Sequence, residues 1–235
     1  MSSHSLLQTV EDVLRKSRDM DGSLNDRLQL VADTVRANSP PFAEAVDRLV
    51  ARLKKTGAGA NAPAVGDAMP AFLLPDDAGR LVGLQELIDN GPVALVFNRG
   101  HWCPYCRTNT AALAQAYDEV RAVGGAIVGI TPDRQKYTLM LKAMAGAPFP
   151  VLTDIDNAYA MSLNLVIWVG AEMQKFQADA GVDLRLCQGN AAWLIPIPAT
   201  FVVGADGLVK ARYVDPDYRQ RMAMEDLIEA MRSAA

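Results

Sequence analysis

Apolar residues in the first third of the chain recur every three or four positions, which predicts three amphipathic helices within residues 1–58. Ser23 followed by Asp26 is a capping signature for the second helix, and Ser39 with Pro40 is typical of the start of the third. The apolar stripes of these helices have two interpretations. They pack against the rest of the chain, or they form the surface of a homodimer.

Residues 59–66 interrupt this pattern. The segment consists mostly of small residues, contains two glycines and one proline, and carries no charge. Such a composition is typical of a linker. We therefore expect a helical segment over residues 1–58, a linker over 59–66 and a main domain over 67–235.

After residue 67 the pattern changes to short apolar runs that alternate with helical stripes. Continuous apolar runs at 93–97 and 126–130 predict two strands buried on both faces, with a helix from Pro104 between them, as in a parallel βαβ unit. The other predicted elements are hairpins over 72–82 and 199–213, an edge strand at 151–152, and helices over 133–145, 154–163, 171–180 and 225–231. This alternation predicts an α/β fold. The rest of the stretch 164–195 shows no clear pattern.

Composition narrows the function. Hydrophobic residues make up 50% of the 235 positions, enough for a packed core, and the net charge of −4 provides no basic field for nucleic acid or an anionic membrane. No stretch has the about 18 apolar residues of a membrane helix. The first residues also lack the charged-then-apolar pattern of a secretory signal. We expect a cytoplasmic protein with no nucleic-acid or membrane partner.

The three cysteines indicate redox chemistry. Cys103 and Cys106 form one C-x-x-C pair, Cys187 stands alone, and the only histidines are His4 and His101. This count of cysteines and histidines falls short of the four ligands of a structural zinc site, and it is too small for a secreted disulfide framework. No metal and no cofactor are therefore expected.

The sequence Trp102-Cys103-Pro104-Tyr105-Cys106 lies at a predicted strand-to-helix junction. Free N–H groups and the helix dipole favour an anion at a helix N-terminus, so a thiolate on Cys103 is stabilised there. Such placement brings the pKa of a thiol in a C-x-x-C pair from about 8.5 to roughly 3.5–7.5. Pro104 suits the first helical position, and Cys106, one turn on, is within reach to close a disulfide.

With the preceding Phe97-Asn98-Arg99-Gly100-His101, this motif resembles the signature of the peroxiredoxin-like branch of the AhpC/TSA family, in the thioredoxin superfamily. Supporting stretches follow in the family's order at 65–72, 149–154, 197–203 and 214–218. The resemblance implies a peroxiredoxin-like variant of the thioredoxin-like fold, a mixed sheet with helices on both faces, here preceded by a helical extension. It also implies that Pro198, two residues before Thr200, is a cis-proline that faces the dithiol.

The chain departs from the ordinary peroxiredoxin pattern, P-x-x-x-T-x-x-C with a distant Arg. In that register Arg99 stands at the Pro, Cys103 at the Thr and Cys106 at the peroxide-reactive Cys. Pro198 falls where the distant Arg would stand, and Arg99 is a candidate replacement cation. Thioredoxin has a buried Asp at the position of Phe97, so this chain needs another route for the proton.

Three further residues keep open interpretations. His101 either lowers the pKa of the Cys103 thiol as a cation or is an exposed loop residue. Trp102 either shields one side of the dithiol and packs there, which is favoured, or has a specific role toward the substrate. Cys187 is either a distant resolving cysteine or a small buried hydrophobe.

Three functions remain open at this point. A thiolate reduces a hydroperoxide, becomes a sulfenic acid and condenses with its neighbour to a disulfide. Alternatively the dithiol reduces protein disulfides through a mixed disulfide, or it is a non-catalytic redox sensor. The first is favoured because the resemblance extends along most of the chain. It needs an external reductant of thioredoxin, glutaredoxin or glutathione type.

The attacking cysteine is also open. Helix electrostatics favour Cys103, taken to be the more exposed end of the motif, whereas the peroxiredoxin register favours Cys106. We predict Cys103, with Cys106 as its resolving partner.

Overall fold

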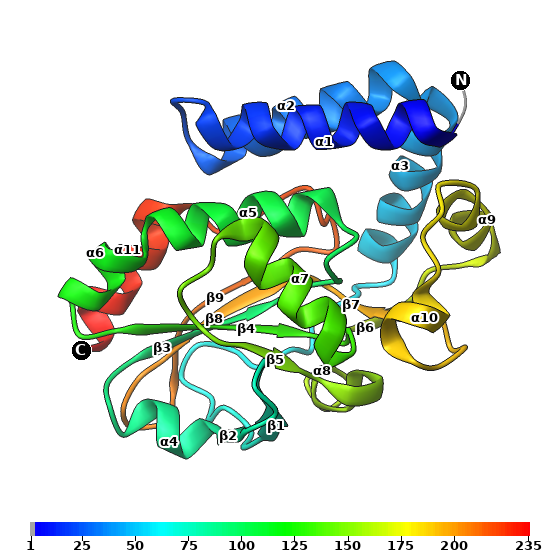
Figure 1. Cartoon of the computed structure of the whole chain (residues 1–235). Coiled ribbons are helices and arrows are strands. Elements are labelled where there is room, and N and C mark those ends of the chain that lie inside the picture. The colour runs from blue at the N-terminus through cyan, green and yellow to red at the C-terminus, as the bar shows by residue number, and fades with distance from the viewer. Residues whose placement is uncertain (1–2) are drawn as a thin grey trace.

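The structure is a computed structural model that describes the backbone of residues 3–235 and the side chains of residues 8–235. In chain order the elements are α1 (Ser3–Asp19), α2 (Leu24–Asn38), α3 (Pro40–Lys55), β1 (Leu73–Pro75), β2 (Leu81–Gly83), α4 (Leu84–Ile88), β3 (Val93–Phe97), α5 (Pro104–Gln115), α6 (Tyr117–Ala122), β4 (Ala126–Thr131), α7 (Gln135–Ala145), β5 (Val151–Thr153), the 3₁₀ turn η1 (Ile155–Asn157), α8 (Ala158–Ser162), β6 (Val166–Trp168), α9 (Ala171–Asp179), α10 (Leu184–Gln188), β7 (Leu194–Pro196), β8 (Ala199–Val203), β9 (Val209–Val214) and α11 (Met224–Ala234) (Figure 1). No helix among these described residues is long and apolar enough to cross a membrane.

A five-stranded mixed sheet in the order β5-β4-β3-β8-β9 forms the centre of the molecule. β3 pairs in parallel with β4 and antiparallel with β8, so that Leu95 lies between Val128 and Phe201. The predicted parallel βαβ unit and the β8–β9 hairpin are both confirmed. β5 pairs only with β4, which confirms the predicted edge strand.

Strand β3 separates two apolar cores because its side chains alternate between the two faces of the sheet. Leu95 and Phe97 belong to one core, together with residues of α4 and β8. Ala94 and Val96 belong to the other, together with residues of α6 and α11. Figure 1 shows α5, α7 and α11 on one side of the sheet and α4 on the other. The predicted α/β architecture is therefore confirmed.

Helices α1 and α2 form an additional layer over α5, and α3 runs down from them beside α9 (Figure 1). The predicted capping box of α2 is present, with reciprocal hydrogen bonds between Ser23 and Asp26. Leu28, Val31 and Leu49 are buried in a cluster that also contains both cysteines of the C-x-x-C pair. Since these stripes are already covered by the chain itself, the apolar argument for a dimer surface no longer holds for α2 and α3.

The segment 59–66 is fixed to the sheet by the guanidinium of Arg212, on β9. Arg212 donates hydrogen bonds to the carbonyl oxygens of Ala62 at 2.8 Å, Pro63 at 3.2 Å and Gly59 at 3.3 Å. The segment with linker composition thus runs along β9 in a defined path.

Two regions differ from the elements predicted by the sequence. The helix expected over 154–163 is broken at Asp156 and Asn157, whose φ angles are +57° and +58°. Within 164–195, α9 is confirmed, but α10 and the antiparallel pair of β6 with β7 were not predicted. Strands of three residues are too short to show a two-residue alternation, so the sequence carries little signal for them.

Candidate active site

The C-x-x-C pair lies where β3 leads into α5. β3 ends at Phe97, residues 98–102 form a short loop, and Cys103 occupies the N-cap of α5. Pro104 is the first helical residue, as predicted, and Cys106 follows within the first turn. The free N–H groups of this turn and the helix dipole are therefore directed toward the dithiol.

Two arginines flank the thiols. The guanidinium of Arg99 lies 4.0 Å from the sulfur of Cys103, and the backbone N–H of Arg99 donates to the sulfur of Cys106 at 3.3 Å. The guanidinium of Arg221 lies 3.7 Å from the sulfur of Cys106. Cys103 is only 1% exposed and Cys106 is fully buried. The expectation that Cys103 is the exposed end of the motif is therefore wrong, because α1 to α3 cover it.

The two thiols have opposite protonation tendencies. Burial by itself raises the pKa of Cys103, but the hydrogen bond from Cys106 and the charges of Arg99 and Arg221 outweigh it, so the pKa falls from 9.0 to about 6. The pKa of Cys106 is raised well above its ordinary value, because this thiol is buried and faces the charge that Cys103 carries. The arrangement favours a Cys103 thiolate that accepts a hydrogen bond from the Cys106 thiol.

Aromatic rings hold the Arg99 guanidinium in place. Its central carbon lies 3.6 Å from the centroid of the Tyr218 ring and 5.0 Å from that of Trp102. Tyr105 packs edge-on against Tyr218, with the centroids 5.3 Å apart. These contacts fix a buried cation beside Cys103. Trp102 lines the pocket beside Cys103 and contacts the Arg99 guanidinium. That it shields the dithiol stays a prediction.

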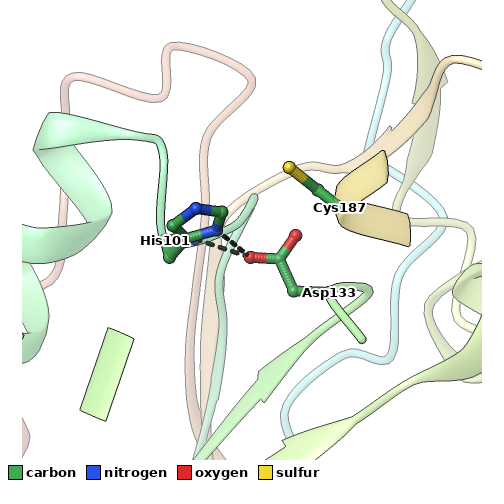
Figure 2. A group of neighbouring side chains, drawn as sticks. All are labelled: His101, Asp133 and Cys187. Carbon is green, nitrogen blue, oxygen red and sulfur yellow. Dashed lines mark hydrogen bonds and ion pairs between the residues drawn. The ribbon is translucent and has the colours of Figure 1, made fainter. Parts of the chain in front are cut away.

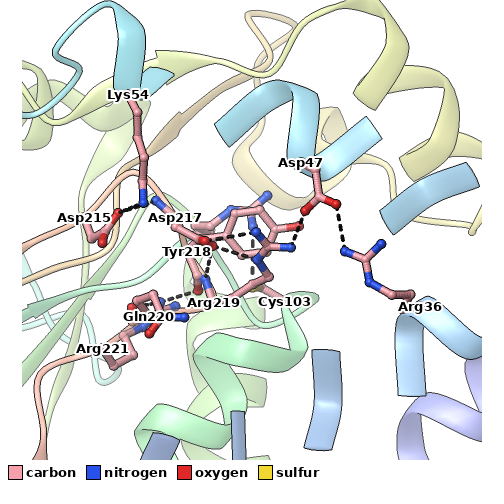
Figure 3. Close-up of polar contacts among 11 residues, drawn as sticks. Arg36, Asp47, Lys54, Cys103, Asp215, Asp217, Tyr218, Arg219, Gln220 and Arg221 are labelled. Atoms are coloured by element: carbon pink, nitrogen blue, oxygen red, sulfur yellow. Dashed lines mark hydrogen bonds and ion pairs between the residues drawn. The ribbon is translucent and has the colours of Figure 1, made fainter. Parts of the chain in front are cut away.

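The loop after β9 is tied to the N-terminal helices by ion pairs (Figure 3). Arg219 pairs with Asp47 of α3 at 2.7 Å and with Asp217 at 2.8 Å, and Asp47 also pairs with Arg36 of α2 at 2.7 Å. Lys54 lies 3.7 Å from Asp215. The N-terminal helices thus position the loop that carries Tyr218 and Arg221.

Sequence reasoning missed the roles of Tyr218 and Arg221. Tyr218 belongs to the stretch 214–218 that carries part of the family resemblance, and Arg221 follows it by three residues. The one signal that could have found them is the presence of an arginine close to a stretch typical of the family.

A largely apolar pocket of about 600 Å³ leads to Cys103. Its lining comes from the N-terminal helices, from α9 and the turn after it, and from the site itself: Val10, Val35, Asn38, Ser39, Pro40, Pro41, Phe42, Arg99, Trp102, Cys103, Pro104, Tyr105, Phe176, Gln177, Asp179, Ala180, Val182 and Tyr218. Phe42 and Phe176 meet edge to face across it, with centroids 5.6 Å apart. Cys103 contributes to this lining and Cys106 does not, so a small molecule in the pocket meets Cys103 first.

His101 and Cys187 lie together in a second cluster rather than beside the dithiol (Figure 2). The ring of His101 is 2.8 Å from a carboxylate oxygen of Asp133 and stacks on Tyr137. The cations next to the C-x-x-C thiols are instead Arg99 and Arg221. Burial, followed by the charges of Asp133 and Asp183, raises the pKa of Cys187 to about 12.

Pro198 and Thr200 lie at the start of β8. The structure has no cis peptide bond among the described residues, so the expectation of a cis bond before Pro198 is wrong. β7 ends at Pro196 and β8 begins at Ala199, and this extended path leaves no tight turn that calls for a cis bond. Thr200 is buried between Val96 of β3 and Tyr213 of β9.

The comparisons with known proteins agree with this geometry. The sequence model of the AhpC/TSA family matches residues 65–212. The 1-Cys peroxiredoxin PER1 of Hordeum vulgare is 24% identical over 176 residues, 72% of this chain and 72% of its own. The crystal structure of peroxidoxin BcpB from Mycobacterium tuberculosis superposes with a TM-score of 0.57 at 20% identity, over 74% of this chain and 99% of its own.

A third neighbour is the yeast mitochondrial 1-Cys peroxiredoxin, whose structure addresses thiol resolving via glutathione/thioredoxin systems. It superposes with a TM-score of 0.53 at 13% identity, over 70% of this chain and 73% of its own. At such identities the two structures show the fold alone, and they confirm the predicted peroxiredoxin-like thioredoxin fold. Since the family match covers more than half of the sequence, the chain belongs to the AhpC/TSA family and is a thiol-based oxidoreductase of the peroxiredoxin type.

Proposed function

We propose that the chain reduces hydroperoxides through a cycle in which Cys103 attacks and Cys106 resolves. The observation that carries this proposal is the position of Cys103. The residue lines the pocket, and its sulfur lies 4.0 Å from the Arg99 guanidinium and accepts a hydrogen bond from the Cys106 thiol. A thiolate, a cation and access for a small substrate meet at this one atom.

In the first step the Cys103 thiolate attacks the terminal oxygen of the hydroperoxide. The O–O bond breaks, Cys103 becomes a sulfenic acid, and the departing alkoxide takes a proton to leave as an alcohol. Arg99 and Arg221 supply the positive charge that stabilises the developing alkoxide. They replace the two hydrogen-bond donors of the ordinary family pattern, the Thr at the position of Cys103 and the distant Arg at the position of Pro198.

In the second step the Cys106 sulfur attacks the sulfenic sulfur of Cys103. The S–O bond breaks, water leaves, and a Cys103–Cys106 disulfide forms. Because the two thiols are already joined by a hydrogen bond, this step needs no second subunit and no distant cysteine. An external dithiol or two thiols then reduce the disulfide by exchange.

The pocket supports a hydroperoxide with an apolar substituent as the substrate. Hydrogen peroxide needs no apolar pocket of about 600 Å³, whereas a hydrocarbon tail gains from contact with Val35, Phe42 and Phe176. Two of these three residues come from the N-terminal helices, which lie outside the matched residues 65–212.

Protein disulfide reduction is the second candidate, because the Trp-Cys-Pro-Tyr-Cys motif is of thioredoxin type. Burial argues against it. A protein disulfide must reach a sulfur that is 1% exposed and covered by the N-terminal helices. These helices would have to move before exchange starts. A redox sensor without turnover is the third candidate, in which oxidation of the pair would act on the same helices.

We place the cycle in the cytoplasm, with a thioredoxin-, glutaredoxin- or glutathione-type reductant. Regeneration of the thiols needs a pool of reductant, which that compartment supplies. Relatedness to proteins resolved by glutathione/thioredoxin systems supports the same class of reductant. A homodimer is compatible with this cycle but is not required by it.

The test is turnover by the full-length chain with thiol reductants in excess. The proposal predicts consumption of an alkyl hydroperoxide at a rate that falls at least about 10³-fold in Cys103→Ser. Reduction of insulin disulfides by the same preparation should be slow. Fast insulin reduction without peroxide turnover would favour the second candidate. Absence of both activities would favour the redox sensor.

A further inference from the structure

A second buried cluster of reactive side chains lies next to the active-site loop. His101 belongs to that loop, Asp133 follows β4, and Cys187 belongs to α10 (Figure 2). One donor atom from each residue, a ring nitrogen, a carboxylate oxygen and a thiol sulfur, lies within 4.8 Å of the other two. The proposed peroxidase cycle uses none of the three.

One carboxylate oxygen of Asp133 faces this cluster without a hydrogen-bond partner among the described residues. The residue is fully buried, and its oxygen Oδ2 accepts from the backbone N–H of His101 and meets the ring Nδ1, both at 2.8 Å. The other oxygen, Oδ1, accepts no hydrogen bond from the described part of the chain. Figure 2 shows Oδ1 on the side where the Cys187 sulfur lies. Buried carboxylate oxygens normally have a partner, so this one calls for an explanation.

Other groups around Asp133 do not supply that partner. Asp133 Oδ1 and the indole N–H of Trp102 both lie close to Gly100, yet neither has a hydrogen-bond partner among the described residues. Thr138 donates to the backbone carbonyl of Asp133 and not to its carboxylate. The free oxygen therefore remains available to a ligand that enters between Asp133 and Cys187.

We propose that His101, Asp133 and Cys187 bind one zinc ion. A nitrogen, an oxygen and a sulfur donor are the set that Zn²⁺ takes in proteins. One carboxylate and one thiolate together balance its two positive charges, which a buried site requires. Zinc bonds of about 2.0–2.3 Å place tetrahedral ligand atoms roughly 3.3–3.8 Å apart, so the widest separation in the cluster, at most 4.8 Å, has to shorten by about 1.0–1.5 Å.

Binding is an exchange of a proton for a metal ion, with no change of oxidation state. The Cys187 thiol loses its proton to solvent as the Zn–S bond forms. The neutral His101 ring keeps its single proton on the nitrogen that does not face the ion, and the other ring nitrogen presents its lone pair to zinc. Three protein ligands leave the fourth position to a water molecule. The His101 side chain is 12% exposed, which gives that water a route.

The ion would join α10 to the active-site loop. A backbone hydrogen bond from Arg134 to the carbonyl of Cys187, at 2.8 Å, already holds α10 beside the residue that follows Asp133. Zinc would extend this link to His101, two residues before Cys103. Counting cysteines and histidines in the sequence misses the site because its third ligand is an aspartate supplied by the fold.

The experiment is a Co²⁺ titration of the reduced, chelator-treated full-length chain, with Co²⁺ as the spectroscopic substitute for Zn²⁺. We expect one equivalent to produce the thiolate-to-Co²⁺ charge-transfer absorption. The Cys103→Ser/Cys106→Ser double variant should keep this band, since the two thiols removed in it are not ligands of the ion. Cys187→Ser should lose it, and Asp133→Asn should weaken Co²⁺ binding at least about tenfold.

A second readout covers the case in which a ligand variant is poorly folded. Zn²⁺ should raise the melting temperature of the double variant but not that of Cys187→Ser or His101→Gln, with circular dichroism checking each fold. The proposal is overturned if the folded wild-type chain gives no thiolate band. It is equally overturned if the band survives in Cys187→Ser and vanishes in the double variant, because the C-x-x-C pair would then be the metal site.

Discussion

Cys103 and Cys187 are both buried thiols, yet their surroundings drive them in opposite directions. Cys103 is 1% exposed and Cys187 is 6% exposed. Burial raises the pKa in both cases, but the Cys106 hydrogen bond and two arginines bring that of Cys103 down to about 6. Asp133 and Asp183 add to the burial of Cys187, and its pKa rises to about 12.

The difference shows that burial alone does not decide whether a cysteine is reactive. The charged side chains next to the thiol decide its reactivity, because guanidinium groups stabilise a thiolate and carboxylates destabilise it. One cysteine is prepared for attack on a substrate, and the other stays protonated until something as strongly charged as a metal ion displaces its proton.

Among variants that keep all three thiols, the largest expected effect comes from removing the cation beside Cys103. In Arg99→Ala the pKa of Cys103 should rise toward that of an ordinary thiol, and the developing alkoxide loses one stabilising charge. We expect kcat/KM for an alkyl hydroperoxide to fall about 10²-fold. Steady-state kinetics measure this, with Arg15→Ala as the control because Arg15 is an exposed residue of α1 that pairs with Asp12. Equal losses in both variants would contradict the role of Arg99.

The pH dependence of alkylation compares the two thiols directly. Because the pKa of Cys103 is lowered, its thiolate is present above pH 6 and is lost as the pH falls. Its alkylation rate should rise about tenfold between pH 5 and 7 and then level off. Cys187 should not react up to pH 9, because its pKa is about 12. Peptide mass spectrometry follows both sites in one sample, and a Cys103 rate still climbing between pH 7 and 9 would contradict this assignment.

The pocket should affect substrate choice more than chemistry. Phe42→Ala removes an apolar wall that contacts Phe176, so KM for a bulky aryl or long-chain hydroperoxide should increase about five- to tenfold. KM for hydrogen peroxide should stay the same. Leu139→Ala is the matched control, since Leu139 is an exposed apolar residue of α7 outside the pocket. An equal increase in KM for both peroxides would contradict a role of the pocket in substrate selection.

The smallest expected effect is on stability. Ser23→Ala removes the capping box of α2 and should lower the free energy of unfolding by about 1 kcal/mol. Both thiols should keep their reactivity, since Ser23 lies far from them along α2. Urea unfolding measures the first quantity and alkylation the second. A change in Cys103 reactivity would mean that the N-terminal helices control the thiols more tightly than their packing indicates.

Much of the fold was readable because its signals are local. The buried run at 93–97, the helix that begins at Pro104 and the Ser23–Asp26 capping box each depend on neighbouring residues, and each has its predicted place. The antiparallel pair of β6 with β7 and the helix α10 were missed because elements of three to five residues carry too little periodicity.

The candidate site was predictable only in part. The C-x-x-C pair and Arg99 lie within one short stretch of sequence, so the motif alone brought them together. Arg221 and Asp133 reach their positions through the fold, and no spacing in the sequence indicates them. The expected exposure of Cys103 was wrong because it depends on how distant segments pack. The expected cis bond at Pro198 was wrong because the chain passes from β7 into β8 without a tight turn.

The most direct test of the account identifies the sulfur that meets the peroxide. Cys103→Ser and Cys106→Ser are each treated with one equivalent of alkyl hydroperoxide in the presence of a sulfenic-acid trap, and the adduct is located by peptide mass. The account predicts an adduct on Cys103 in Cys106→Ser and no peroxide consumption by Cys103→Ser. Consumption of peroxide by Cys103→Ser, with the adduct on Cys106, would contradict it.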